Sequence, residues 1–273
     1  MLIDAHAHLD GYDELGKGAL EAALEEIEDH QIFTISNSMD LQSYRRNKEV
    51  AARSNLVLPV FGIHPWNAHK FSWSDKDFTQ AMEESPLFGE IGLDRYFVKD
   101  ESLYPAQDRM FRYLLAAARA RDKAVIVHAK GAEAEALAAL DEIGLKRVII
   151  HWYSGPLDVF EEMASRGFYF TVGSEVLRSK HIQDIAREVR LDRLLTESDN
   201  PGGPKSITGK PGRPKIIESV VEALARLRGL TVEALEGVIR RNLVRLLEDD
   251  PYLVANSAVG RLLDADPAIP PSH

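Results

Sequence analysis

Eight short apolar runs alternate with longer helix-like segments along this chain, and this alternation restricts the fold more than any other feature. Several runs are nearly continuous Val, Ile, Leu and Phe, as expected of strands that are buried on both faces. Strands that are separated by helices indicate a parallel sheet. We predict strands over Met1–His8, Ile32–Asn37, Leu56–His64, Leu87–Leu93, Ala124–His128, Arg147–His151, Phe168–Val172 and Leu194–Glu197.

The segments between the runs repeat their apolar residues with a helical period. The predicted helices are Glu14–Asp29, Leu41–Arg53, Gln107–Arg121, Ala132–Glu142, Pro156–Arg166, Lys180–Val189 and Pro214–Arg228. Thr231 is a suitable N-cap for an extra C-terminal helix, Val232–Leu247. Eight strand–helix units predict a TIM-type (β/α)8 barrel, a fold of about 250 residues, with an eight-stranded parallel sheet. A doubly wound open sheet is the alternative.

Length and composition limit the domain organisation and the partners. We expect one domain over residues 1–250 and a Pro-, Ala- and Ser-rich extension over 251–273. The absence of cysteine excludes disulfides and thiolate chemistry. No apolar stretch approaches the roughly 18 residues of a membrane span, and no signal-peptide pattern is present, so we expect a cytoplasmic protein without membrane contact. A formal net charge of −10 does not attract polyanions over the whole surface.

Ionisable side chains gather at the carboxyl ends of the predicted strands, which form the active-site face of a barrel. Buried charges are costly unless they are paired or bound to metal. A single histidine in such a place is usually a hydrogen-bonded core residue, but this clustering favours metal. We therefore predict two divalent ions (Zn²⁺, Mg²⁺ or Mn²⁺) with His6, His8, Glu90, His128, His151 and Asp199 as ligands.

The spacing of these residues indicates how they act. His6 and His8 are two residues apart on a strand and so point to the same side. Glu90 lies among glycines, where its two carboxylate oxygens can bridge two cations; its alternative is an ion pair with Arg95. Asp199 can bind an ion and hold the attacking water, although it can also cap the segment that follows.

Two further features are assigned to the substrate. His64 ends the third strand in Gly62-Ile63-His64-Pro65, and we assign it to substrate rather than to metal. The segment 202–214 is rich in Gly and Pro and carries Lys205, Lys210 and Arg213. It either covers an anionic substrate or is a solvated surface loop.

Taken together, the motifs resemble those of the TatD-related deoxyribonucleases, a family of the amidohydrolase superfamily, from about residue 2 to residue 247. They are Asp4-Ala5-His6-Ala7-His8-Leu9-Asp10, Gly62-Ile63-His64-Pro65, Gly89-Glu90-Ile91-Gly92-Leu93-Asp94, Val127-His128, His151-x-x-Ser154-Gly155 and Thr196-Glu197-Ser198-Asp199. The resemblance implies a metal-dependent hydrolase that acts on DNA phosphodiesters. It also implies that one ion lies among His6, His8, Glu90 and Asp199, and the other among Glu90, His128 and His151.

This chain departs from the family pattern around the substrate. Lys130 stands where an arginine is frequent, and it keeps the charge without the bidentate fork. Trp66 replaces a second histidine, and Trp152-Tyr153 stands where Cys-Phe is common. The metal ligands are kept while the substrate contacts are altered.

The expected function is a deoxyribonuclease of the 3′–5′ exonuclease type. Asp199 orients the water and takes its proton, and His64 and Lys130 hold the phosphate. Trp66 or Trp152 is available to stack on an unpaired base, so we expect DNA that is single-stranded or accessible at its ends.

Two alternatives remain open. The first is an amidohydrolase-type hydrolase of a small non-nucleic ester, amide, lactone or phosphoester. The second is a non-catalytic metal-binding protein with a protein partner that docks at an exposed Tyr153 and at the tail after Pro251. The sequence leaves the oligomeric state open.

Overall fold

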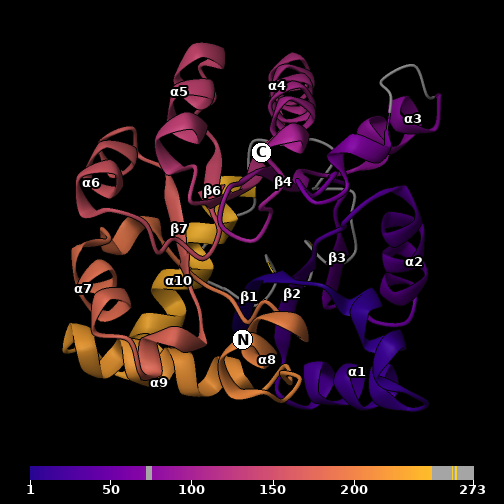
Figure 1. Ribbon diagram of the computed structural model, residues 1–273. Helices are drawn as coiled ribbons and strands as arrows, with labels where there is room; N and C mark the ends of the chain where they lie inside the picture. Colours follow the sequence, from indigo (N-terminus) through magenta and orange to yellow (C-terminus); the bar gives the residue numbers. More distant parts are fainter. Residues whose placement is uncertain (72–75, 248–259, 261, 263–273) are drawn as a thin grey trace, which may run out of the picture.

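The structure, a computed structural model, describes residues 1–71, 76–247, 260 and 262. Within these residues the chain forms eight parallel strands that alternate with helices around a barrel (Figure 1). The strands are β1 (Leu2–Ala7), β2 (Ile32–Ser36), β3 (Val57–Pro59), β4 (Phe88–Asp94), β5 (Val125–Lys130), β6 (Val148–Ile150), β7 (Tyr169–Val172) and β8 (Leu194–Thr196). Each corresponds to one predicted run. Nearly all of the predicted extension 251–273 lies outside the described residues.

Hydrogen bonds between strand ends join two sheets into the barrel. Strands β1 to β3 form one parallel sheet and β4 to β8 form the other. Between β3 and β4, Phe61 pairs with Phe88, and the Gly89 amide donates to the Phe61 carbonyl at 2.9 Å. Beyond β8, the Asp199 amide donates to the His6 carbonyl of β1 at 2.8 Å. The sheets therefore meet on both sides, as a TIM-type barrel requires and an open sheet does not.

Helices surround the strands on the outside of the barrel (Figure 1). They are α1 (Ala19–Asp29), α2 (Leu41–Ala51), α3 (Lys76–Glu84), α4 (Tyr104–Ala120), α5 (Glu133–Ile143), α6 (Leu157–Ser165), α7 (Lys180–Glu188), α8 (Gly202–Thr208), α9 (Ile216–Arg228) and α10 (Val232–Leu247). Short 3-10 helices are η1 (Leu9–Leu15), η2 (Ala68–Lys70), η3 (Glu101–Leu103), η4 (Ser174–Leu177) and η5 (Leu191–Arg193).

The helices differ from the prediction in three places. Helix α1 begins five residues later than Glu14, because Gly16 and Gly18 have φ angles of 106° and 85° and interrupt the helix. Helix α3, of nine residues, was not predicted. Helix α8 replaces the first half of the predicted loop 202–214. Pro204 lies in its first turn, where a missing amide hydrogen is tolerated, and Gly209 ends it with φ 74°.

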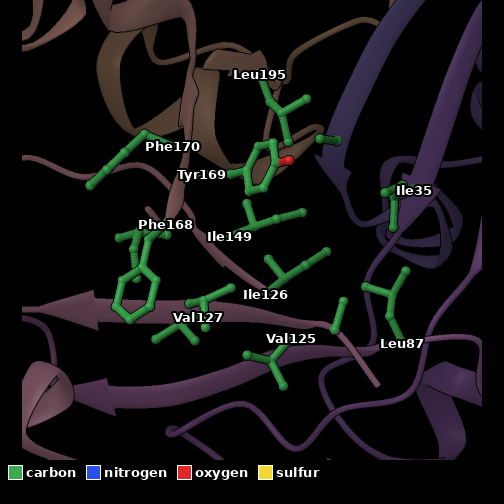
Figure 2. Packing of buried hydrophobic residues seen from close by; sticks show 14 of the residues in the cluster. Ile35, Leu87, Val125, Ile126, Val127, Ile149, Phe168, Tyr169, Phe170 and Leu195 are labelled. Carbon is green, nitrogen blue, oxygen red and sulfur yellow. The ribbon is translucent and has the colours of Figure 1, made fainter. Parts of the chain in front are cut away.

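Side chains along each strand point alternately into and out of the barrel, and this alternation decides which residues reach the open end of the barrel. Ile126 and Ile149 are register partners on β5 and β6, and Figure 2 shows the Tyr169 ring between Ile149 and Leu195; the two isoleucines and Leu195 are fully buried. Residues two positions further along point to the same side. The inner face of β5 therefore continues to His128, and that of β6 continues to His151, at the carboxyl ends of the strands.

Helix α10 lies against β1 and β8 at the opposite end of the barrel. The buried Asn242 side chain donates to the carbonyls of Leu191 and Leu194, at 2.7 and 2.9 Å, where β8 begins. The Met1 amino group lies 3.6 Å from Glu236. The extra C-terminal helix thus supports the end of the barrel away from the histidines. No helix in the described part of the chain is long and apolar enough to cross a membrane.

We expect Asn242→Leu to lower the free energy of unfolding by about 1–3 kcal/mol, because two buried carbonyls lose their donor. Urea unfolding followed by circular dichroism measures the change. Arg245→Ala, at an exposed position of the same helix, is the control. Equal stability of Asn242→Leu and the unsubstituted protein would contradict the supporting role.

Candidate metal centre

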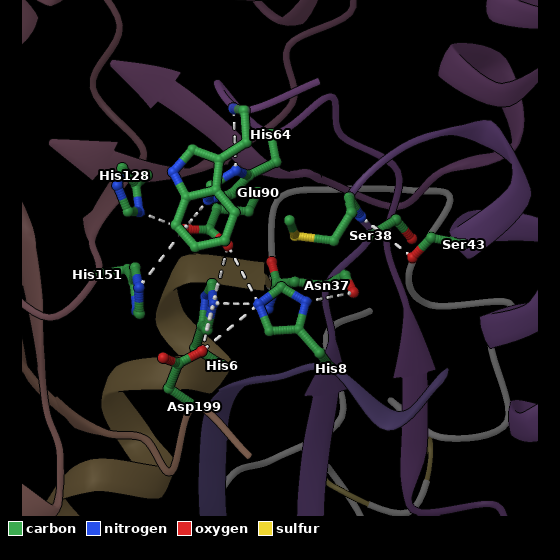
Figure 3. Close-up of polar contacts among 12 residues, drawn as sticks. His6, His8, Asn37, Ser38, Ser43, His64, Glu90, His128, His151 and Asp199 are labelled. Carbon is green, nitrogen blue, oxygen red and sulfur yellow. Dashed lines mark hydrogen bonds and ion pairs between the residues drawn. The ribbon is translucent and has the colours of Figure 1, made fainter. Parts of the chain in front are cut away.

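Seven ionisable side chains converge at the carboxyl ends of the strands. Figure 3 shows the imidazoles arranged around the Glu90 carboxylate, with Asp199 next to His6 and His8. The side chains are His6, His8, His64, Glu90, His128, His151 and Asp199, and none is more than 17% exposed. The structure therefore brings together all six predicted metal ligands, with His64 beside them.

A first group of potential ligand atoms lies around the imidazoles of His6 and His8. His6 Nε2 and His8 Nε2 are 3.2 Å apart, and they lie 3.3 and 3.2 Å from Glu90 Oε2. Their distances to Asp199 Oδ1 are 3.6 and 3.5 Å. Four ligands at about 2.1 Å from a tetrahedral ion are about 3.4 Å from one another. The atoms of His6, His8 and Glu90 are thus placed to share one ion, and Asp199 lies within reach of both imidazoles.

A second group surrounds the other oxygen of the same carboxylate. Glu90 Oε1 lies 2.6 Å from His128 Nδ1, 3.4 Å from His64 Nε2 and 3.5 Å from His151 Nε2. His64, which the sequence assigned to substrate, therefore stands in a group of potential ligands with Glu90 and His128. The two oxygens of Glu90 face two separate groups, as a bridging carboxylate does.

The electrostatics of the cluster suit divalent cations. Burial alone would raise the pKa of Glu90, but the imidazoles of His64, His6 and His151 hold it well below its usual range. Burial, together with the His151 imidazole, lowers the pKa of His6 to about 3, so His6 is neutral as a ligand must be. The Nδ1 atom of His6 is buried and has no hydrogen-bond partner in the described structure.

The raised pKa values of two histidines also indicate that the carboxylates of the cluster favour positive charge beside them. Burial opposes the protonation of His8 and His128. Hydrogen bonds to carboxylates nevertheless raise the pKa of each to about 9. The carboxylate is that of Glu90 for His8, and those of Asp94 and Glu90 for His128. Cations at the two groups would supply the same charge. The donor set of imidazoles and carboxylates fits Zn²⁺ or Mn²⁺ better than Ca²⁺.

Two carboxylates outside the predicted set hold the histidines in place. Glu197 Oε2 lies 2.6 Å from His151 Nδ1 and accepts a hydrogen bond from Thr171 Oγ1 at 2.7 Å. Asp94 Oδ2 lies 3.1 Å from His128 Nε2. Such partners fix the orientation of a ligating imidazole.

The sequence carried a signal for both of these carboxylates. Glu197 is two residues before Asp199, and Asp94 is four residues after Glu90. Glu90 and Asp94 both lie on β4, an even number of residues apart, so alternation along the strand predicts that they point to the same side. Glu197 comes directly after β8, and its position at the end of an apolar run is its signal.

Glycines beside Glu90 let the strands approach one another closely. A Cβ atom on Gly92, whose φ is 155°, would lie 1.9 Å from the His128 carbonyl oxygen. A Cβ atom on Gly89 would lie 2.3 Å from the Asn37 side-chain oxygen. Either substitution would push a neighbouring segment, and the Glu90 carboxylate with it, out of place.

The alternative roles for Glu90 and Asp199 do not match the structure. Arg95 pairs with Asp108 at 2.8 Å, while Glu90 faces the imidazoles. Helix α8 has Pro201 at its N-cap and no side-chain cap, so Asp199 does not cap it. The Asp199 backbone has φ 50°, an uncommon value for this residue type, and strain of this kind gathers at functional sites.

A cavity of about 420 Å³ opens onto the cluster. Its wall includes Lys130, whose Nζ donates to Ser154 Oγ at 2.6 Å and lies 4.8 Å from the centre of the Trp152 ring. Within the basic segment, Lys205 reaches the wall, whereas Arg213 pairs with Glu26.

The expectation of an exposed Tyr153 was wrong. Its side chain is buried, and its hydroxyl donates to the Pro156 carbonyl at 2.6 Å. The chain turns inward after His151, so the ring packs against Phe160 and Phe170 instead of facing solvent.

Comparisons with known proteins agree with this arrangement. A family model described as TatD related DNase matches residues 3–248. The uncharacterized metal-dependent hydrolase YcfH of Escherichia coli K12 is 29% identical over 257 residues, which cover 91% of this chain and 96% of YcfH. The human deoxyribonuclease TATDN3 is 25% identical, with 90% of this chain and 94% of TATDN3 covered. The crystal structure of YJJV, a TatD homolog of Escherichia coli K12, has a TM-score of 0.79 at 25% identity, over 90% of this chain and 97% of YJJV. This chain belongs to the TatD-related DNase family and is a metal-dependent hydrolase.

Proposed function

We propose that this protein is a deoxyribonuclease that hydrolyses phosphodiester bonds with water activated between two divalent ions. The observation that carries the proposal is the position of Glu90. Its Oε2 atom faces His6 and His8 while its Oε1 atom faces His64, His128 and His151. Paired sites of this kind stabilise both the attacking and the leaving oxygens in phosphoryl chemistry.

Asp199 is the residue we assign to the water. Divalent ions in the two groups would activate water and offset the negative charge of the phosphate. The Asp199 side chain is 17% exposed, against 2% for Glu90, and it lines the cavity. Burial raises its pKa well above the usual range, and the Glu90 carboxylate adds to that effect. Asp199 is therefore the carboxylate best placed to orient a water molecule and accept its proton.

The phosphate would lie between the cluster and the cationic wall. Lys130 lines the cavity, and burial lowers the pKa of its ammonium group from the usual value. An ammonium group here can neutralise one phosphate oxygen as a point charge. His64 is within reach of both the cavity and Glu90, so it is available to the substrate or to the second ion.

Size and charge favour single-stranded DNA or chain ends as the substrate. A cavity of about 420 Å³ has room for a group of nucleotide size, so an unpaired nucleotide or a strand end can enter it. The net charge of −10 gives no general attraction for long DNA. We propose that cleavage begins at a 3′ end and proceeds in the 3′–5′ direction. Labelling the DNA at one end or the other tests this direction.

A hydrolase of a small ester, amide or phosphoester is the second candidate. The apolar part of the cavity wall favours it, since Leu15, Met39 and Phe97 line the space beside the histidines. The third alternative, a non-catalytic docking protein, loses its proposed aromatic contact because Tyr153 is buried, and the tail after Pro251, its other proposed contact, lies almost entirely outside the described residues.

We expect divalent cations to raise the melting temperature of the protein by roughly 5–10 °C, because saturation at about 100 times Kd adds about 2.7 kcal/mol of stability. In Glu90→Gln the increase should fall below about 2 °C, since both groups lose their shared anionic ligand. Differential scanning calorimetry with Mn²⁺ or Zn²⁺ measures both shifts.

Glu135→Gln is the matched control, because Glu135 is exposed on α5 and belongs to none of the groups of potential metal ligands. It should keep the full increase. A Glu90→Gln variant that gained as much from cations as the unsubstituted protein would remove Glu90 from the metal sites.

We expect the unsubstituted protein with Mg²⁺, Mn²⁺ or Zn²⁺ to shorten end-labelled single-stranded DNA in steps. Asp199→Asn should lower the rate by about 100-fold or more at saturating cation, because the proton acceptor is lost. A label at the 5′ end should give a ladder, whereas a label at the 3′ end should be released first.

Asp192→Asn serves as the control, since Asp192 pairs with Arg190 at the other end of the barrel. Intact DNA in every reaction, combined with metal-dependent hydrolysis of a small phosphoester or ester, would favour the second candidate. Full activity of Asp199→Asn on DNA would contradict the role of Asp199.

A further inference from the structure

Three exposed aromatic side chains gather at one side of the cavity mouth. Trp66, Tyr96 and Phe97 are 44%, 59% and 51% exposed. Trp66 follows β3, and the other two follow β4. Trp66 and Phe97 line the cavity itself. Large apolar groups that are exposed together, rather than singly, mark a binding surface.

The three rings contact one another by their edges. The ring centres of Trp66 and Phe97 are 5.9 Å apart with an interplanar angle of 74°, and those of Tyr96 and Phe97 are 4.8 Å apart at 90°. An edge-to-face contact occupies at most one face of one ring. Flat ring surface is therefore left for a planar ligand that enters the cavity.

Asp94 fixes this aromatic rim to the metal centre. Its Oδ2 atom accepts a hydrogen bond from Trp66 Nε1 at 2.7 Å and lies 3.1 Å from His128 Nε2. Its Oδ1 atom accepts from the backbone amides of Tyr96 and Phe97, at 2.9 and 2.7 Å. Asp94 itself is fully buried. One carboxylate thus sets the rim at a defined place relative to the histidines.

Positive charge lies beside the rim. Lys99 Nζ lies 5.0 Å from the centre of the Tyr96 ring. Lys130, which pairs with Asp94 in the register of β4 and β5, also lines the cavity. A planar group that rests on the aromatic rings would therefore have cations within reach of anions attached to it. A nucleobase with its phosphates has this chemistry, and an aliphatic ester does not.

We propose that Trp66 and Phe97, flanked by Tyr96, form a stacking site for an unpaired nucleobase of the substrate. The proposal rests on the proposed nuclease function and specifies its substrate. A base must leave its duplex partner to lie flat on these rings, so the site selects single strands and frayed ends. Stacking tolerates all four bases, because each has an aromatic face. The aromatic rim thus distinguishes single-stranded from double-stranded DNA and does not distinguish one base sequence from another.

Equilibrium binding tests the site apart from cleavage. We would measure the fluorescence anisotropy of a labelled single-stranded oligonucleotide, and of the same strand with abasic residues in its terminal nucleotides. The protein is the full chain with Asp199→Asn, which prevents cleavage. Loss of the bases should weaken binding about fivefold or more, the effect of one stacking contact.

Phe97→Ala, added to Asp199→Asn, should weaken binding of the intact strand by a similar factor and leave binding of the abasic strand unchanged. Trp66→Phe should lose less than Trp66→Ala, since it keeps a ring. Leu157→Ala is the control: Leu157 is as exposed as Trp66, at 44%, but lies on α6 away from the cavity.

A Phe97→Ala variant that kept the full preference for the intact strand would overturn the proposal. So would a change in the oligomeric state of Phe97→Ala with unchanged affinity, which would assign the rim to protein contact. Base-dependent binding without cleavage by the unsubstituted protein would refute the nuclease function alone. Absence of binding to either strand would refute both.

Discussion

The burial of one carboxylate among five imidazoles organises this protein. Glu90 is 2% exposed, and five histidines from β1, β3, β5 and β6 or the residues just after them approach it within 3.5 Å. A charge in such a place requires compensation from several directions at once. Only the closed ring of strands supplies neighbours on every side. The barrel, the glycines beside Glu90 and the backbone of Asp199 all serve to bring these groups to one point.

The fold and the members of the cluster could be predicted from the sequence because both depend on short-range periodicity. Alternating apolar runs defined the strands, and the position of each histidine at a strand end placed it at the mouth of the barrel. The pairwise assignment of ligands to ions was implied only by the family resemblance and stays a proposal. His64 shows the limit: it was predicted at the end of the third strand, but β3 ends at Pro59, and the distance from His64 to Glu90 depends on the segment that follows.

Features that depend on loops escaped the prediction. Tyr153 turns inward because of packing beyond β6, which no local pattern reveals. Helix α8 forms from a segment whose Gly and Pro content suggested a loop. The anchoring of the aromatic rim by Asp94 joins residues from two loops, and its hydrogen bonds appear only once both loops are folded. Such segments carry substrate preference on a scaffold that the strands determine.

We propose that Glu90 bridges two ions. Crystals of the protein loaded with Mn²⁺ or Zn²⁺, measured for anomalous scattering at the edge of that metal, are the strongest test. We expect two anomalous peaks, one beside Glu90 Oε2 near His6 and His8, the other beside Oε1 near His128 and His151. A single peak that contacts only one oxygen of Glu90, or peaks remote from Glu90, would contradict it.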